Sequence, residues 1–237
     1  MSSLKERLAR GDVATMALVN YTSPTLVEHL GALDFDMVLI DCEKGSATTE
    51  RIEEMCRAAR AAGVVSVVRP WATEPGLISR YLDLGADGVM IAGVETPAEA
   101  RGIVEAVRYA RWKDHERKFL FAMIESPAAI DRLPELLQVD GIDVWFIGPN
   151  DLAHRMGMPG RADHPSVRSA VRGALTAIRD AGRVGGTVLA QDISELINAG
   201  ARVVLTRVTD LLRRGTLEFQ AELPASSRRQ NKEKNRD

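Results

Sequence analysis

Three ionisable side chains follow a hydrophobic run in the segment FDMVLIDCEKG, residues 35–45. Asp41, Glu43 and Lys44 come directly after the aliphatic residues 38–40. Charged groups are buried cheaply only when they are paired or bound to a metal ion. The pattern therefore indicates a buried strand that delivers charged groups to a site at its carboxyl end.

Further charged residues end other hydrophobic runs. Arg69 ends VVSVVR, Glu125 ends KFLFAMIE, and Asp151 follows IDVWFIGPN. The carboxylates of Glu125 and Asp151 are oxygen ligands of the kind that Mg²⁺ or Mn²⁺ prefers, and two of them leave positions for water and an oxygen-rich substrate. The alternative is a salt-bridge network that closes this end of the fold without chemistry.

Eight short runs rich in β-branched residues alternate with segments of helical period. The expected strands are residues 15–20, 35–41, 64–70, 87–93, 118–125, 142–149, 184–190 and 202–208. The expected helices are residues 25–33, 48–63, 74–85, 96–110, 126–138, 166–182, 192–200 and 211–223. This α/β alternation predicts a parallel eight-stranded (β/α)8 TIM barrel, a single domain over residues 1–224. No G-x-G-x-x-G follows any strand, which argues against a dinucleotide-binding sheet.

The loops that follow the strands of such a barrel converge at one end. Residues 41–44, Arg69, Glu125 and Asp151 are therefore expected to meet there. Strand periodicity also places Glu125 on the same face as the inward residues of its strand. By contrast, polar residues at the opposite strand ends are expected to be ordinary solvated groups; these are Asp36, Lys118 and Asp143.

Composition argues against several classes of protein. The 237 residues include 31 basic and 33 acidic ones, so there is no electrostatic footprint for nucleic acid or a membrane surface. No apolar run approaches the roughly 18 residues that a membrane span needs, and the amino terminus lacks the apolar core of a secretory signal. Cys42 and Cys56 form no metal-type pair or disulfide framework. We expect a cytoplasmic protein with a charged, disordered tail over residues 225–237.

Several longer segments carry a family resemblance. IDCEK, VVRP, YLDLGADGVMIAGVETPAEAR, IES and VDGIDVWFIGPNDLAHRMGMPG with a later HP resemble the HpcH/HpaI family of metal-dependent class II 2-oxo-acid aldolases. The likeness spans about residues 5–222. It implies a carbon–carbon lyase that acts through the enolate of a small 2-oxo acid such as pyruvate or oxaloacetate. It also implies a divalent metal (Mg²⁺ or Mn²⁺, with Co²⁺ as a further candidate) and a homo-oligomer, a dimer or hexamer, joined through the C-terminal helix.

The resemblance implies roles for the charged residues already described. Glu125 and Asp151 match the metal ligands of the family, and Arg69 matches the arginine that binds the keto oxygen and stabilises the enolate. These roles agree with elementary chemistry. A metal-bound ketone is polarised, and a fixed cation beside it stabilises the charge that develops on the enolate oxygen.

Other positions match the supporting parts of the family site. Asp41 and Asp83 correspond to acidic residues that support the catalytic apparatus. The backbone around Gly148, Asn150 and Asp151 would hold the substrate carboxylate at the start of a helix, where amide groups lack partners within the helix.

The sequence departs from the family at positions expected near the acceptor, which is the carbonyl compound that combines with the enolate. The family pattern D-x-E-H ends in a histidine at the position that Lys44 occupies in this sequence. Lysine ordinarily stays charged at the pH where histidine titrates. Lys44 is therefore expected to bind an anionic substrate group or to steady a developing alkoxide rather than to shuttle protons. Met123 replaces a glutamine, and RYARWKDHERK (108–118) replaces a glycine- and proline-rich loop that borders the substrate's variable end.

These departures leave other functions open. A biosynthetic condensing enzyme of the same fold, such as one that forms citrate from oxaloacetate and an acyl-CoA in a siderophore pathway, would suit the positive charge of Arg111, Lys113 and Arg117. A catalytically weak descendant that binds a 2-oxo acid would suit the missing histidine. A Schiff-base aldolase with Lys44 as nucleophile is disfavoured because Glu125 and Asp151 are retained.

Overall fold

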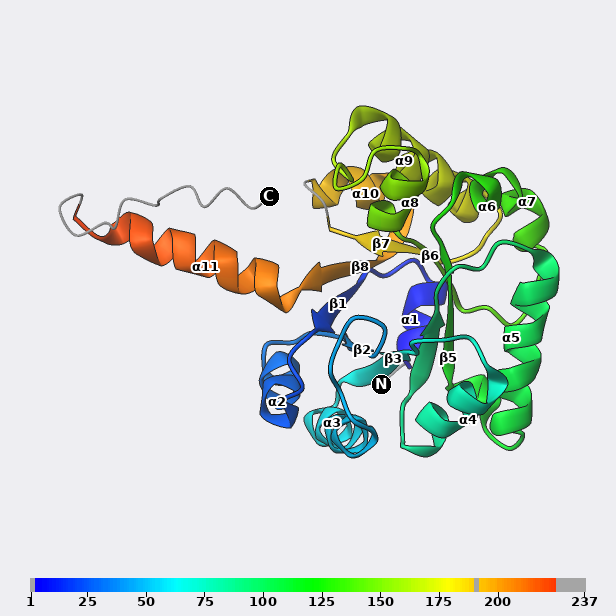
Figure 1. Ribbon diagram of the computed structural model, residues 1–237, viewed down its shortest axis with the longest axis horizontal. Helices are drawn as coiled ribbons and strands as arrows, with labels where there is room; N and C mark the ends of the chain where they lie inside the picture. Colours follow the sequence, from blue (N-terminus) through cyan, green and yellow to red (C-terminus); the bar gives the residue numbers. More distant parts are fainter. Residues whose placement is uncertain (1–2, 190–191, 225–237) are drawn as a thin grey trace.

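The computed structural model describes residues 3–189 and 192–224 and shows a closed barrel of eight parallel strands (Figure 1). The strands are β1 (Ala14–Val19), β2 (Met37–Asp41), β3 (Val65–Arg69), β4 (Gly88–Ile91), β5 (Phe119–Ile124), β6 (Val144–Ile147), β7 (Gly185–Val188) and β8 (Ala201–Arg207). Each strand pairs with its successor, and β8 pairs with β1. The predicted TIM barrel is confirmed. The predicted tail over residues 225–237 lies outside the described residues.

Helices connect the strands and cover the outside of the barrel. The predicted helices correspond to α2 (Pro24–Ala32), α3 (Thr49–Ala62), α4 (Pro75–Asp83), α5 (Pro97–Ala110), α9 (Pro165–Asp180), α10 (Ile193–Ala199) and α11 (Val208–Glu222). The expected helix over 126–138 is divided into α6 (Pro127–Asp131) and α7 (Leu133–Leu136), with Pro134 in the first turn of α7. Proline is compatible with a first turn but not with the interior of a continuous helix. Two short helices escaped prediction, α1 (Leu4–Ala9) and α8 (Pro149–Arg155), and a 3-10 turn spans His115–Arg117.

Alternate residues of each strand face the inside of the barrel. Phe121 and Met123 of β5 belong to an inner core, whereas Leu120, Ala122 and Ile124 pack under the helices in an outer layer. This confirms the period of two that the sequence predicted for this strand. The next inward position after Met123 is residue 125, so the strand itself delivers a carboxylate to the mouth of the barrel.

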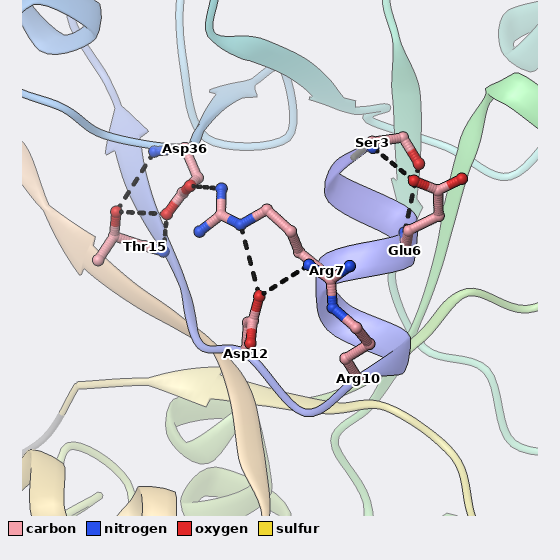
Figure 2. Close-up of polar contacts among 7 residues, drawn as sticks. All are labelled: Ser3, Glu6, Arg7, Arg10, Asp12, Thr15 and Asp36. Carbon is pink, nitrogen blue, oxygen red and sulfur yellow. Dashed lines mark hydrogen bonds and ion pairs between the residues drawn. The ribbon is translucent and has the colours of Figure 1, made fainter. Parts of the chain in front are cut away.

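Helix α1 closes the amino-terminal end of the barrel. Leu8 is buried in the inner core, and Arg7 forms an ion pair with Asp36, with 2.7 Å between Nη1 and Oδ1 (Figure 2). Arg7 also lies 3.8 Å from Asp12. The other oxygen of Asp36 accepts a hydrogen bond from the Thr15 amide at the start of β1. One aspartate therefore joins α1, β1 and the segment that leads into β2.

The same device recurs around this end of the barrel. Three aspartates, each just before a strand, accept a hydrogen bond from the amide of the second residue of the preceding strand. The donors and acceptors are Thr15 and Asp36 at 2.9 Å, Ser66 and Asp87 at 3.1 Å, and Leu120 and Asp143 at 2.8 Å. The expectation that Asp36, Lys118 and Asp143 are ordinary solvated groups is therefore wrong, since all three are partly buried and hydrogen-bonded. They fix the register of the strands whose far ends carry the site.

No helix among residues 3–189 and 192–224 combines the length and the apolar character that crossing a membrane requires.

Removing one of these aspartates should weaken the fold. Asp36→Ala leaves the Thr15 amide and the Arg7 guanidinium without their acceptor, and an unsatisfied partly buried donor costs about 1–3 kcal/mol. We expect the free energy of unfolding in urea to fall by that amount. Asp131→Ala, at an exposed aspartate at the end of α6, should leave it unchanged; equal losses in the two variants would contradict this account.

Candidate active site

A cleft of about 110 Å³ opens at the carboxyl end of the barrel. Its charged lining residues are Asp41, Lys44, Arg69, Glu125, Asp151 and Arg207. Gly148 and Asn150 line it as well. The structure therefore brings together, from four strands and the start of one helix, nearly all the residues that the sequence singled out.

Arg69 and Asp41 form the best-defined contact in the cleft. They are direct partners in the register of β2 and β3. The Arg69 guanidinium donates from Nε to Oδ1 of Asp41 at 2.9 Å and from Nη2 to Oδ2 at 2.7 Å. Its Nη1 lies 3.1 Å from a carboxylate oxygen of Glu43. Asp41 is 2% exposed and Arg69 7%, so two-point geometry and burial both hold the guanidinium in one orientation.

The charge of Arg69 is equally well secured. Burial by itself would lower the pKa of Arg69, but the hydrogen bonds and charge of Asp41, followed by the charges of Glu43 and Glu125, raise it above its usual value. Arg69 is therefore a permanent, oriented cation in a nearly dry position.

Asp41 also shapes the loop that follows β2. Its Oδ1 accepts hydrogen bonds from the amides of Glu43 at 3.1 Å and Lys44 at 3.4 Å. The chain then doubles back so closely that a Cβ atom on Gly45 would lie 2.1 Å from the Asp41 carbonyl oxygen. The charged residues of DCEKG therefore form a tight turn around the Asp41 carboxylate, and this turn explains why charged residues follow β2.

Glu125 differs from Asp41 in its electrostatic surroundings. It is 8% exposed, and within the described part of the chain no group donates a hydrogen bond to its carboxylate. Burial, the charge of Asp151 and the charge of Glu43 raise the pKa of Glu125 to about 7, and Arg69 and Arg155 only partly oppose this. The centre of the cleft therefore carries a carboxylate whose negative charge is not compensated.

Asp151 lies at the start of α8, beside Glu125. Its nearest cation is Lys44, whose Nζ lies 3.6 Å from Oδ2, and both side chains are about half exposed. The first hydrogen bond of α8 runs from the Leu152 amide to the carbonyl of Gly148, so the amides of Asn150 and Asp151 precede it and have no acceptor within the helix. A Cβ atom on Gly148 would come within 3.0 Å of Oε2 of Glu125, so glycine is needed for α8 to start this close to Glu125.

The donor set around Glu125 fits a hard divalent cation. Glu125 and Asp151 supply carboxylate oxygens in one cleft, and Glu125 lacks a competing hydrogen-bond donor among residues 3–189 and 192–224. The same residues include no group of three or more histidine, cysteine, aspartate or glutamate side chains that could hold a metal. Two carboxylates suit an ion that keeps water or substrate oxygens as its other ligands, and they do not suit a structural zinc site.

The structure corrects the expected placement of Asp83. Because each helix after a strand runs back along the barrel, the end of α4 lies at the amino-terminal end, away from the cleft. The Asp83 side chain is 68% exposed there and pairs with Arg111 at 3.4 Å. The loop over 108–118 lies at the same end, since it leads into the start of β5. Within one chain, therefore, neither Asp83 nor this loop borders the cleft.

Sequence reasoning missed two polar residues of the site. Asn20 and Arg207 line the cleft from the ends of β1 and β8. It placed Glu43 at this end of the barrel but assigned it no contact, and the structure pairs Glu43 with Arg69. Arg207 lies 3.8 Å from Asp210. The signal was present, because Asn20 and Arg207 stand at the carboxyl ends of their strands, where Arg69 and Glu125 also stand.

The fold and the cleft together define a TIM-barrel enzyme whose chemistry lies at the carboxyl ends of its strands. The HpcH/HpaI aldolase/citrate lyase family model matches residues 14–206. A 2-keto-3-deoxy-L-rhamnonate aldolase of Escherichia coli K12 is 32% identical over 233 residues, which cover 88% of this chain and 87% of that protein.

Solved structures agree with this match. An HpcH/HpaI aldolase/citrate lyase family protein from Burkholderia cenocepacia J2315 is 27% identical, with a TM-score of 0.83 and coverage of 93% of this chain and 99% of that one. The citrate synthase SbnG is 25% identical, with a TM-score of 0.84 and coverage of 92% and 96%. The chain belongs to the HpcH/HpaI aldolase/citrate lyase family, and it is an enzyme of the class II aldolase type. The resemblance that the sequence motifs indicated is confirmed.

The uncompensated charge of Glu125 should be visible in the pH dependence of stability. In a metal-free solution with EDTA, the folded-state pKa of about 7 lies above the ordinary value of 4.5, so the folded state favours the protonated acid. The stability contributed by protonation is therefore lost as the pH rises from about 4.5 to about 7. Glu125→Gln, which cannot ionise, should gain on the order of 2–3 kcal/mol relative to wild type between pH 5 and pH 8.

Urea unfolding of both proteins at the two pH values measures this difference. The same substitution at the exposed Glu105 provides the control and should show no such gain. A difference between Glu125→Gln and wild type that does not change with pH would contradict the assigned environment of Glu125.

Proposed function

We propose that the protein is a metal-dependent carbon–carbon lyase that acts through the enolate of a small 2-oxo acid such as pyruvate or oxaloacetate. The observation that carries the proposal is Glu125, a buried carboxylate without a hydrogen-bond donor among the described residues, set beside Asp151 and near the fixed cation Arg69. An excess of negative charge beside an oriented positive group suits the binding of a cation and an enolate oxygen. Kinship with a 2-keto-3-deoxy-L-rhamnonate aldolase supports the same reaction class.

Glu125 and Asp151 would hold the divalent ion, Mg²⁺ or Mn²⁺. When bound, such an ion supplies Lewis-acid polarisation of the substrate carbonyl. The charges of the two carboxylates, which raise each other's energy in the cleft, would then be compensated. The Nζ atom of Lys44 lies 3.6 Å from Oδ2 of Asp151, and the Lys44 side chain is more than half exposed. This side chain can therefore move away when an ion binds.

Arg69 would stabilise the negative charge that develops on the enolate oxygen. A guanidinium has five N–H donors. The hydrogen bonds to Asp41 use two of them, and Nη1 also forms an ion pair with Glu43. At least two donors therefore remain for the substrate. Because Asp41 already fixes the orientation, no reorganisation is needed as the charge forms, which is the condition under which such stabilisation is strongest.

The start of α8 would bind the substrate carboxylate. The amides of Asn150 and Asp151 have no acceptor within the helix, and Gly148 lets this backbone approach Glu125 closely. Lys44 would then face the anionic or alkoxide oxygen of the second reactant. A Schiff base at Lys44 is disfavoured, because Glu125 and Asp151, the carboxylates that suit a divalent ion, are both present in the cleft.

Exchange of the C3 protons of pyruvate and oxaloacetate with solvent tests this function without knowledge of the acceptor. We expect Mn²⁺-dependent exchange that EDTA abolishes. Glu125→Ala should reduce the exchange rate by at least 100-fold because it removes a metal ligand. Arg69→Lys should also reduce it by about 100-fold or more, since it loses the preorganised donors.

The exposed Glu105→Ala variant is the control and should retain the wild-type rate. Binding of Mn²⁺ should raise the melting temperature of wild type and of Arg69→Lys but not that of Glu125→Ala. Exchange that persists in EDTA, or in Glu125→Ala, would refute the metal-dependent enolate.

A second candidate is a condensing enzyme in which the enolate of an acyl thioester attacks the ketone of oxaloacetate, after which hydrolysis of the product thioester releases coenzyme A. The likeness to the citrate synthase SbnG favours it. The lyase requires C3 exchange because the 2-oxo acid supplies its enolate, whereas the condensing enzyme does not because the acyl thioester supplies the enolate. Release of free coenzyme A from acetyl-CoA and oxaloacetate would establish condensation, whereas cleavage of a 4-hydroxy-2-oxo acid would establish the lyase. Exchange without either reaction would indicate a weak descendant that binds a 2-oxo acid.

We further propose that the protein self-associates through α11. This helix projects away from the barrel (Figure 1), and Val208 at its start is its one buried residue within the described chain. Leu212, Leu217 and Phe219 are 57%, 50% and 63% exposed. A 15-residue helix that packs so little against its own fold gains little stability in isolation, so a second copy is expected to cover its apolar side chains.

Light scattering coupled to size-exclusion chromatography tests this association. Wild type should elute as an oligomer, and Leu217→Asp with Phe219→Asp should shift it toward the monomer because charge is placed in an apolar interface. Thr216→Asp, at an exposed polar position of the same helix, is the matched control. A monomeric wild type would refute the proposal.

A further inference from the structure

A second space opens from the cleft between the loop after β3 and the loop after β4. This cavity of about 200 Å³ is lined by Glu43 and Glu125 on the side of the active site and by Trp71, Ala92 and Gly93 on the other. Glu125 lines both this cavity and the active-site cleft. A molecule whose reacting carbonyl lies at Glu125 can therefore extend into it.

The cavity adjoins a groove between α4 and α5, which pack side by side. The groove has a volume of about 320 Å³. The residues that line both spaces are Thr73, Ile91, Ala92 and Gly93. The groove therefore lies next to the cavity that reaches Glu125, and it has the size of a small-molecule site.

The walls of the groove are apolar. Ile78, Ile91, Val94 and Ile103 line it and are each less than a tenth exposed. Its acidic lining residue, Glu99, accepts hydrogen bonds from the amides of Glu95 and Thr96 at the start of α5 and is thereby occupied. The groove is thus lined mainly by apolar side chains and offers few partners for hydroxyl or charged groups.

Glycine keeps the groove open along α5. A Cβ atom built on Gly102 meets no heavy atom within 4 Å, although the residue lines the groove. At the junction, Gly93 has a φ of +69°, and a Cβ there would lie 3.8 Å from Oε1 of Glu125. The groove therefore has room for a larger side chain at Gly102, and Gly93 lies at its junction with the cavity beside Glu125.

We propose that this groove binds an unbranched aliphatic chain on the carbonyl compound that reacts with the enolate. The inference rests on the proposed function, and it names the substrate class: a 4-hydroxy-2-oxo acid with an apolar far end. When its C3–C4 bond breaks, the electron pair passes to C3 as the enolate, which takes up a proton there. The C4 hydroxyl loses its proton, and an aliphatic aldehyde leaves through the groove.

Two features select this occupant. Apolar walls favour each methylene group that they cover. The described residues that line the two spaces include no lysine, arginine or histidine that could pair with a carboxylate or phosphate on the chain. A neutral hydrocarbon chain satisfies both conditions.

The test compares aldehydes of increasing length, from acetaldehyde to hexanal, as acceptors for pyruvate in the condensation direction. In wild type, kcat/KM should rise about threefold to fourfold for each added methylene that the groove covers. Gly102→Leu fills the groove without disturbing α5, and it should lower the ratio of kcat/KM for hexanal to that for acetaldehyde at least tenfold.

Gly173→Leu is the matched control. Gly173 is an exposed glycine inside α9, and a Cβ there likewise meets nothing within 4 Å, so the ratio should stay at the wild-type value. A flat profile in wild type, or an unchanged ratio in Gly102→Leu, would overturn the proposal.

A binding experiment separates failure of the groove from failure of the enolate chemistry. Hexanamide, a neutral and unreactive analogue, should change the intrinsic fluorescence of wild type because Trp71 lines the passage. The change should be absent in Trp71→Phe, which lacks the reporter, and in Gly102→Leu, which lacks the space. If C3 exchange fails while this binding is seen, the proposed function is wrong but the groove still binds an aliphatic chain. If wild type and Gly102→Leu respond equally to hexanamide, the proposal for the groove is overturned.

Discussion

The buried pair of Asp41 and Arg69 is the interaction on which the cleft depends. It joins the carboxyl ends of two adjacent strands through two hydrogen bonds, and both side chains are almost completely excluded from water. Removing one member of such a pair leaves an uncompensated buried charge, at a cost of about 3–5 kcal/mol. The same aspartate shapes the loop that carries Glu43 and Lys44. One contact therefore sets the orientation of the cation and the course of the loop beside it.

The balance of charge in the cleft distinguishes a reactive site from a simple network of ion pairs. Glu43 is paired with Arg69, and Asp151 with Lys44. Glu125, the most buried of these three carboxylates, has neither an ion pair nor a hydrogen-bond donor in the part of the chain that the structure describes. A network that served only to close the barrel would not leave a buried acid uncompensated, because that arrangement is costly. The asymmetry suits a site that receives a cation from solution.

Stability and chemistry are divided between the two ends of the barrel. At the amino-terminal end, α1 and the aspartates that bind strand amides hold the register of the strands. At the carboxyl end, the strands stop on charged groups whose mutual repulsion the rest of the fold must tolerate. This division explains why aspartates with similar local sequence, such as Asp36 and Asp41, serve different purposes. Each lies at a different end of the same strand.

The amino-acid sequence by itself determined the barrel, the inward face of β5, and the convergence of Arg69, Glu125 and Asp151, because these follow from local periodicity and from the geometry of parallel strands. Only the tertiary structure decided which charges pair, since Glu43 and Arg69 meet across strands and pairing depends on distances that periodicity does not contain. It also removed Asp83 from the cleft, because a residue near the end of a helix lies at the opposite end of the barrel from the strand that precedes that helix. The groove between α4 and α5 was likewise beyond sequence reasoning, because empty space is a property of packed side chains and not of any one segment.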